Sequence, residues 1–308
     1  MIRQQELDRA AAIIRSGGLV AIPTETVYGL GADALNAQAV ARIYAVKGRP
    51  STSPLIVHVC SVEMARSLVT DWPQSASRLA ARYWPGPLTI VLPKKPVVPD
   101  IVTAGLSTVG LRMPAHPAAL ELIRRSATPL AAPSANRFTG ISPTTAEHVR
   151  RSLGDQIDMI LDGGPCDVGI ESTVLSLAGP ATLLRPGMIP LEELESVIGQ
   201  PLAKAGMAEG AHPSPGMHAR HYSPRTPLLI VDGSLPPGRG AYLWWRRELE
   251  AELKLRLGDT AEAYAHQLYD ALDRADQAGL DWIAIEAVPQ AMEWCGIRDR
   301  IQRASARD

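Results

Sequence analysis

The 308-residue chain has few aromatic side chains, few cysteines and no excess of basic residues. Aromatic residues make up 5% of it, with a single phenylalanine at Phe138, so aliphatic side chains must build the core. Lys plus Arg number 31 and Asp plus Glu 32, which gives a net charge of −1. Proteins that hold nucleic acid by its phosphates normally carry a basic excess, so we expect no direct, stable nucleic-acid binding.

The three cysteines, Cys60, Cys166 and Cys295, stand at no metal-ligand or redox spacing. This favours a reducing compartment and argues against a structural zinc site. The N-terminus is too polar for a secretory signal, and no apolar run approaches the roughly 18 residues that span a bilayer. We therefore expect a cytoplasmic protein with no membrane contact and no metal site of its own.

Several familiar catalytic motifs are also missing. The sequence contains no G-x-x-x-x-G-K-[ST], no G-x-G-x-x-G, no H-E-x-x-H and no G-x-S-x-G. Classical P-loop, dinucleotide-binding, zincin and serine-hydrolase functions therefore lack support. Hydrophobic residues make up 46% of the chain and charged residues 20%, as in a globular protein with a sizeable core.

Apolar runs alternate with segments of helical periodicity up to about residue 200, which predicts a sheet domain of the α/β or α+β class. The predicted helices are 5–16, 36–47, 61–69, 75–83, 117–125 and 144–152. The predicted strands are 19–22, 55–59, 88–92, 108–112, 130–132, 157–161, 172–177 and 181–185.

Residues 203–226 are dense in Gly, Pro and His, which indicates a linker with defined turns. Strands are predicted again at 228–231, 241–244 and 282–285, and helices at 260–277 and 290–304. We therefore divide the chain into a catalytic domain 1–202, a linker 203–226 and a small Rossmann-like, three-layer α/β domain 227–308.

Polar loops follow several of the predicted strands. Each of them alone also fits an ordinary capped turn. In Lys47-Gly48-Arg49-Pro50, however, two cations stand on a stiff turn beside a strand. Such a pair could clamp a polyphosphate, and arginine can do so with two parallel hydrogen bonds. The other polar loops cover residues 23–31, 133–143, 162–173 and 184–187.

Two polar residues fall inside apolar strands. His58 lies within 55–59, where a histidine is more often a hydrogen-bonded core residue than a ligand. Arg112 ends the strand 108–112 and would be costly to bury without an anion. A substrate carboxylate and a structural Asp or Glu are both possible partners. The linker histidines have no carboxylate at ligand spacing, so a metal is not favoured there.

Taken together, these loops resemble the YrdC-like family in its longer, two-domain form, the L-threonylcarbamoyladenylate synthases. The resemblance is dense over about residues 8–200, good in the linker and looser beyond it. The matching stretches are PTETVYGLGADA (23–34), KGRP (47–50), SPLIVHV (53–59), PGPLTIVL (85–92), TVGLRMPAHP (108–117), APSANRFTGISPT (132–144), DGGP (162–165), GIESTV (169–174), LLRPG (183–187) and SPGMHARHYSP (214–224).

The resemblance implies a twisted mixed sheet with a large concave, positively charged cleft. It also implies a reaction that joins L-threonine, bicarbonate (or CO2) and ATP, with Mg²⁺, into threonylcarbamoyl-AMP and pyrophosphate. The product would pass to a downstream transferase that completes threonylcarbamoyl-adenosine in tRNA. We expect a monomer, and the C-terminal domain receives no function from the resemblance.

The resemblance also assigns site residues. The family's Lys-x-Arg and Ser-x-Asn pairs, expected to be catalytic, correspond to Lys47, Arg49, Ser134 and Asn136. L-Threonine would contact Thr26, His58, Arg112, Ala132 and Ser172. ATP would contact Arg49, Ser53, Thr108, Ser134, Ser142, Arg185 and Tyr222. Ser53 stands where the family commonly has Asn, and the linker 213–224 is expected to fold over the cleft as a lid.

Two other functions are considered beside this one. Some short YrdC-like proteins are credited with RNA binding, and a locally basic cleft would allow it here. The YrdC-like module of hydrogenase maturation proteins transfers a carbamoyl group, but those proteins carry acylphosphatase and zinc-finger segments. Three cysteines cannot build such fingers.

Overall fold

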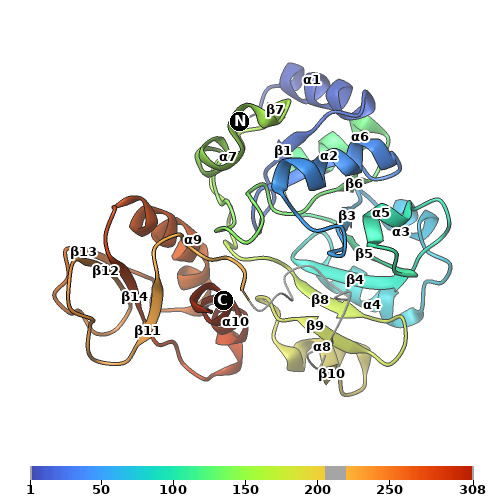
Figure 1. The fold of residues 1–308 in the computed structure, drawn as a ribbon. Helices are drawn as coiled ribbons and strands as arrows, with labels where there is room; N and C mark the ends of the chain where they lie inside the picture. Colours follow the sequence, from blue (N-terminus) through green and yellow to red (C-terminus); the bar gives the residue numbers. More distant parts are fainter. Residues whose placement is uncertain (1, 205–219, 307–308) are drawn as a thin grey trace.

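The computed structural model describes residues 2–204 and 220–306, which build two units on two separate sheets (Figure 1). Residues 205–219, which include the first part of the predicted lid, lie outside the described residues. Among the residues described, no helix is both long and apolar enough to cross a membrane.

The larger unit is a ten-stranded mixed sheet in the order β10-β9-β8-β4-β5-β3-β6-β2-β1-β7, as the sequence predicts in class. Parallel pairs such as β3·β5 and β4·β8 alternate with antiparallel pairs such as β4·β5 and β8·β9. The strands are β1 (Val20–Ile22), β2 (Gly29–Asp33), β3 (Ile56–His58), β4 (Leu88–Pro93), β5 (Thr108–Arg112), β6 (Leu130–Ala131), β7 (Met159–Ile160), β8 (Thr173–Ser176), β9 (Thr182–Arg185) and β10 (Ala203–Lys204).

Helices cover this sheet, and their ends carry the expected capping residues. Asn36 accepts hydrogen bonds from the backbone of Gln38 and Ala39, and Gly48 ends the same helix with a φ of 63°. The helix predicted from 144 is capped by Thr145, one residue later. The helices are α1 (Gln4–Arg15), α2 (Ala37–Lys47), α3 (Val62–Ser67), α4 (Gln74–Tyr83), α5 (Asp100–Thr103), α6 (Pro117–Ser126), α7 (Ala146–Leu153) and α8 (Leu191–Ile198).

The segment 23–31, predicted to be one polar loop, is a loop followed by strand β2. Strand β2 pairs with β1 on one side and β6 on the other. A Cβ at Gly29 would lie 3.2 Å from the Cβ of Ala132, and one at Gly31 would lie 3.2 Å from the carbonyl oxygen of Val20. Glycine at these two positions therefore permits close packing between strands. In the sequence, the same glycines suggested a turn.

The smaller unit is a four-stranded parallel sheet in the order β11-β14-β12-β13. Both of its α-helices pack into one apolar cluster on one face of the sheet, with Leu243 and Ile283. On the other face, Tyr242 and Trp282 pack against loop residues such as Leu235 and Leu249, so loops and not a helix form the third predicted layer. The elements are β11 (Leu228–Val231), β12 (Gly240–Trp244), β13 (Leu253–Arg256), α9 (Ala261–Gln277), β14 (Trp282–Glu286) and α10 (Cys295–Ser305).

The two units meet at closely approaching glycines. A Cβ at Gly169, whose φ is +85°, would lie 2.3 Å from the carbonyl oxygen of Ala265 in α9. A Cβ at Gly296 in α10 would lie 2.5 Å from the carbonyl oxygen of Gly187. Both approaches are closer than any side chain allows, so backbone packs on backbone at this junction. The C-terminal unit is thereby held against the loops that follow β7 and β9.

The Gly169→Ala substitution tests this junction, with Gly164→Ala as its control. Both glycines have a φ near +85°, but nothing lies within 4 Å of a Cβ at Gly164. The control should cost about 1–2 kcal/mol for its left-handed backbone. Gly169→Ala should cost about 1–3 kcal/mol more, because α9 must move away. Urea unfolding measures both variants, and equal losses would show that the junction is not tightly packed.

Candidate active site

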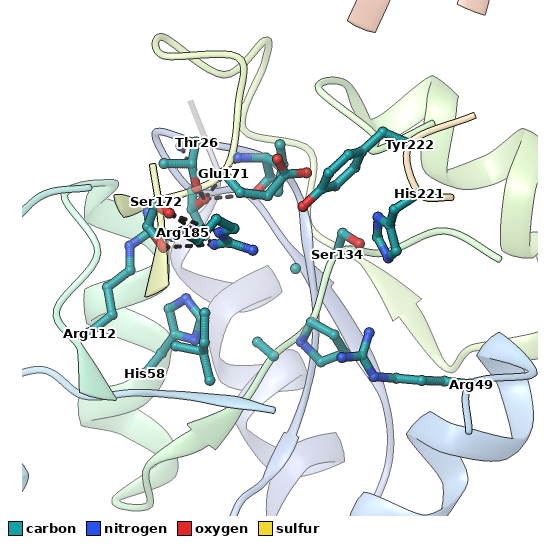
Figure 2. Close-up of a pocket in the computed structure, with 16 residues that line it drawn as sticks. Thr26, Arg49, His58, Arg112, Ser134, Glu171, Ser172, Arg185, His221 and Tyr222 are labelled. Carbon is teal, nitrogen blue, oxygen red and sulfur yellow. Dashed lines mark hydrogen bonds between the residues drawn. The ribbon is translucent and has the colours of Figure 1, made fainter. Parts of the chain in front are cut away.

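The loops that follow the central strands enclose a cavity of about 50 Å³ (Figure 2). A single water needs about 10–15 Å³ of such space, so the cavity as it stands has room for a few water molecules. Nine of the predicted site residues line this cavity: Thr26, Arg49, His58, Arg112, Ala132, Ser134, Ser172, Arg185 and Tyr222. The fold therefore brings these predicted residues, which come from loops far apart in sequence, to one place.

Arg49 lies in the loop that follows α2 and lines the cavity. Its Nη2 donates to the Ser53 hydroxyl at 2.6 Å and to the Pro54 carbonyl at 3.0 Å, and its Nε donates to the Ser53 carbonyl. Burial lowers the pKa of Arg49 to about 10, so the group stays protonated near neutral pH. Ser53 does not line the cavity, and its hydroxyl instead fixes the guanidinium.

Lys47 does not line the cavity either. Its Nζ donates to the carbonyl oxygens of Ser134 and Asn136, at 2.6 and 2.5 Å. Burial and the charge of Arg49 lower the pKa of Lys47 well below its usual value. The Asn136 amide donates to the carbonyls of Arg137 and Gly140. In this arrangement Lys47 and Asn136 hold the loop that presents Ser134, and neither faces the cavity.

Arg112 pairs with a structural carboxylate, one of the two kinds of partner that the sequence left open. Its Nη2 lies 2.7 Å from Oε1 of Glu25, and both side chains are buried. Its Nε donates to the carbonyl of Gly86. Glu25 also accepts from the backbone of Ala115. Glu25 thus compensates the charge of Arg112, whose side chain also lines the cavity.

His58 pairs with Arg112 in the register of β3 and β5, so both side chains stand at the same edge of the sheet. Burial, followed by the nearby charge of Arg112, lowers the pKa of His58 to about 3. Its Nδ1 is buried and has no hydrogen-bond partner within residues 2–204 and 220–306. The imidazole is therefore neutral, and it offers an unused polar atom to a ligand.

Arg185 ends β9 and turns toward the loop before β8. Its Nε and Nη2 donate to the Ser172 carbonyl at 3.1 and 3.0 Å, and Nη2 also reaches the Ser172 hydroxyl. That hydroxyl lies 2.8 Å from the hydroxyl of Thr89. Arg185 and Ser172 are therefore fixed to each other at one side of the cavity (Figure 2).

Glu171 is the one carboxylate that lines the described cavity. Its Oε1 accepts from Ser142 at 2.5 Å, and its Oε2 accepts from Tyr269 at 3.0 Å and from Arg300 at 2.7 Å. Burial alone would raise the pKa of Glu171, but the charges of Arg300 and Arg185 outweigh it and lower the pKa. Ser142 therefore contacts Glu171 and does not line the cavity.

Tyr222 and His221 close the cavity on the side of the C-terminal unit, and both side chains point into it (Figure 2). The rings of His221 and Tyr222 are 4.2 Å apart, and that of Tyr269 is 5.9 Å from Tyr222. Tyr222 has a φ of 62°, unusual for a bulky residue, and backbone strain of this kind is common at functional sites. Its buried hydroxyl has no hydrogen-bond partner in the described chain.

Thr108 lies apart from these residues. It lines a neighbouring, smaller cavity with Leu106 and Gly110, and the two cavities share Ile56. The described residues contain no group of three His, Cys, Asp or Glu side chains that could hold a metal ion. The charged lining consists of three arginines and one carboxylate, so the cavity is electropositive, as the resemblance implies.

Sequence reasoning assigned no role to Glu25, Glu171, Tyr269 or Arg300. Glu25 and Glu171 stand inside two of the quoted motifs, and a search for the anion that balances Arg112 could have found Glu25. Arg300 lies on the buried face of an amphipathic helix in the loosely matching C-terminal unit, and no local motif marks it. Only the folded structure brings Arg300 to Glu171.

Comparison with known proteins places this fold and site in one class. Residues 12–187 match the family model Sua5_yciO_yrdC, described as "Telomere recombination". Residues 189–306 match the model Sua5_C, the C-terminal domain of threonylcarbamoyl-AMP synthase. The fold is therefore that of a YrdC-like domain followed by a Sua5 C-terminal domain.

Relatives that cover almost the whole chain narrow this further. A protein from Pyrococcus abyssi named threonylcarbamoyl-AMP synthase is 43% identical, over 99% of this chain and 95% of its own. The protein of the same name from Bacillus subtilis is also 43% identical, over 97% and 93%. The crystal structure of P. abyssi Sua5 complexed with L-threonine superposes with a TM-score of 0.93 at 42% identity, over 99% of this chain and 95% of that one. The chain belongs to the Sua5/YrdC family in its two-domain form, the threonylcarbamoyl-AMP synthases.

The neutral state of His58 predicts how stability changes in acid. Its pKa is about 3 in the folded protein and about 6.5 when unfolded. The unfolded chain therefore binds more protons at this site between these values, and stability falls as the pH falls through that window. The contribution is at most about 1.4 kcal/mol per pH unit.

A His58→Gln variant should lack this contribution. Urea unfolding at pH 7.0, 5.5 and 4.5 should show the wild-type chain losing more free energy of unfolding than the variant on acidification. The other titrating groups are common to both proteins and cancel in the difference. Parallel pH profiles would mean that His58 titrates normally in the folded state.

Proposed function

We propose that the cavity is where L-threonine, bicarbonate (or CO2) and ATP meet and react to give threonylcarbamoyl-AMP and pyrophosphate. The observation that carries this proposal is the trio of cavity-lining arginines, Arg49, Arg112 and Arg185, each fixed by its own buried partners. Two of them suit a triphosphate, and the third suits a carboxylate. The family to which the chain belongs supports the same reaction.

The threonine end of the cavity is assigned to β3, β5 and the loops beside them. The cavity-lining guanidinium of Arg112 suits the threonine carboxylate, while Glu25 keeps it in place. Thr26, Ser172 and the unused Nδ1 of His58 offer polar contacts, and Ala132 offers an apolar surface for the methyl group. With the carboxylate bound, the amino group remains the reactive end of the molecule.

The nucleotide end is assigned to Arg49, Arg185, Ser134 and Tyr222, whose polar groups face the same cavity. Lys47, Asn136, Ser53 and Ser142 would contribute by holding these groups. Thr108 could reach ATP only from the neighbouring cavity. We propose that Ser53 acts through Arg49, so the usual Asn is not needed for a direct contact.

The reaction proposed for this site requires positioning and charge stabilisation more than a covalent nucleophile. The threonine amine captures CO2 as a carbamate, the carbamate oxygen attacks the α-phosphorus of ATP, and pyrophosphate leaves. Negative charge builds up on the phosphates during the attack, and Arg49 and Arg185 are placed to stabilise it. Exclusion of water by His221 and Tyr222 would protect the labile mixed anhydride.

Mg²⁺ is proposed to enter with the nucleotide, as part of the substrate. Both carboxylate oxygens of Glu171 already accept hydrogen bonds, and Glu25 is bound to Arg112 and to Ala115. These side chains do not fit a resident metal site. When bound, Mg²⁺ would share the neutralisation of the phosphates with the arginines.

The remaining expectations fit this function. We propose a monomeric cytoplasmic enzyme with a catalytic domain 1–202, a linker 203–226 that borders the cavity through His221 and Tyr222, and a C-terminal domain 227–308. Its product would pass to a tRNA-modifying transferase. RNA binding without synthesis is not favoured, because Arg49, Arg112 and Arg185 line a cavity and each is held there by buried partners.

Pyrophosphate release tests the proposed function. Release from ATP should require both L-threonine and bicarbonate, because only the carbamate supplies the attacking oxygen. Arg49→Ala should lower the rate about ten- to a hundredfold, the effect of losing one charged hydrogen-bond partner. Arg82→Ala, an exposed change on α4, is the matched control and should leave the rate unchanged. Equal release with ATP alone would identify a plain ATPase.

A further inference from the structure

We propose that Arg300, in the last helix of the C-terminal unit, is a positioning residue for the reaction. This inference rests on the proposed function and extends it to a domain to which the sequence analysis assigned no role. Arg300 contacts none of the three substrates in the proposed arrangement. It acts through Glu171, Arg185 and Tyr222, which line the cavity.

Arg300 is fully buried, and each of its three guanidinium nitrogens donates to the larger unit. Its Nε donates to the carboxylate of Glu171 at 2.7 Å, and Nη2 donates to the carbonyl of the same residue at 3.2 Å. Its Nη1 donates to the carbonyl of Pro186 at 2.9 Å. One planar guanidinium thus bridges two separate loops of the larger unit, which only arginine can do.

These two loops are the ones that present Ser172 and Arg185. Ser172 directly follows Glu171, and Arg185 directly precedes Pro186. Arg185 in turn donates to the carbonyl and hydroxyl of Ser172. Arg300 therefore closes a ring of contacts that fixes the spacing of the loops after β9 and before β8. A change in that spacing would move the cation of Arg185 away from the phosphates.

Tyr222 is held by the same guanidinium. The Cζ atom of Arg300 lies 5.2 Å from the centre of the Tyr222 ring, within the range of a cation–π contact. The ring of Tyr269 lies 5.9 Å from that of Tyr222, and its hydroxyl donates to Glu171. The C-terminal unit thus supplies Arg300 and Tyr269 to one network, and that network ends at the unpaired hydroxyl of Tyr222.

Arg300 and Glu171 must be changed together if no buried, unpaired ion is to remain. Asp299 lies 2.8 Å from Arg300 and also accepts from Arg303, so it keeps a partner when Arg300 is changed. Glu171 would lose its counter-charge, which is strongly destabilising for a buried carboxylate. The Glu171→Gln/Arg300→Met double variant removes both charges at once, and Glu171→Gln alone is its reference.

The test compares ATP binding by the full-length wild-type chain, Glu171→Gln and the double variant, measured by titration calorimetry. Thermal unfolding first establishes that each chain folds. We expect the double variant to bind ATP about tenfold more weakly than Glu171→Gln, because Arg185 and Tyr222 lose their anchor. The KM for L-threonine should rise less than the ATP affinity falls, since Thr26, His58 and Arg112 do not contact Arg300 and only Ser172 belongs to the loop that Arg300 holds.

Two further variants separate positioning from a merely structural role. Arg298 lies on the same helix but donates to the carbonyls of Pro289 and Ala291 within its own unit. Arg298→Met should leave ATP affinity unchanged even where it lowers thermal stability. Arg300→Lys keeps a positive charge beside Glu171 but loses the forked guanidinium. Its stability should stay near that of the wild type, but it should keep only part of the wild-type ATP affinity.

Equal ATP affinity in Glu171→Gln and in the double variant would overturn the positioning role, and so would a loss as large in Arg298→Met. A wild-type chain that binds ATP but releases no pyrophosphate with threonine and bicarbonate would overturn the proposed function alone. The ATP titrations would still decide on Arg300 in that case. A wild-type chain that does not bind ATP would overturn both.

Discussion

The buried carboxylate of Glu171 is the point on which the rest of the molecule depends. It accepts hydrogen bonds from Ser142 in the larger unit and from Tyr269 and Arg300 in the smaller one. An ionised carboxylate is stable at such depth only with this full set of donors. Because the donors come from both units, the charge of Glu171 and the docking of the C-terminal unit require each other.

The buried arginines in and around the cavity are likewise held by compensating groups. Arg112 is compensated by Glu25, Arg300 by Glu171 and Asp299, and Arg49 is held by neutral oxygen atoms of Ser53 and Pro54. Cations that are already oriented before the substrates arrive need little reorganisation during the reaction. Desolvation makes Arg49 and Arg185 more effective toward a phosphate than they would be in water. A cavity of this kind suits chemistry in which the protein positions and neutralises anions.

Much of this site could be predicted from the sequence, because its residues stand in short motifs at strand ends. The Lys47–Pro50 turn and the stretch around Ser134 both contribute residues to the cavity lining, whereas Lys47 itself contacts the Ser134 loop and does not line the cavity. Local patterns could not reveal β2, whose glycines resemble a turn, or the order of ten short strands. They also could not reveal Arg300, since a buried arginine on a helix has the same local pattern whether its partner is structural or belongs to a site. Long-range packing alone decides that.

We propose that the cavity binds threonine by its carboxylate and leaves its amine to react through a carbamate. Mass spectrometry of the product formed with ¹³C-labelled bicarbonate is the decisive measurement. We expect an adenylate that contains threonine and one ¹³C atom, whose label is lost when unlabelled bicarbonate is supplied. An unlabelled threonyl adenylate would mean that the threonine carboxylate attacks ATP, and it would contradict the assignment of Arg112 and of the reaction.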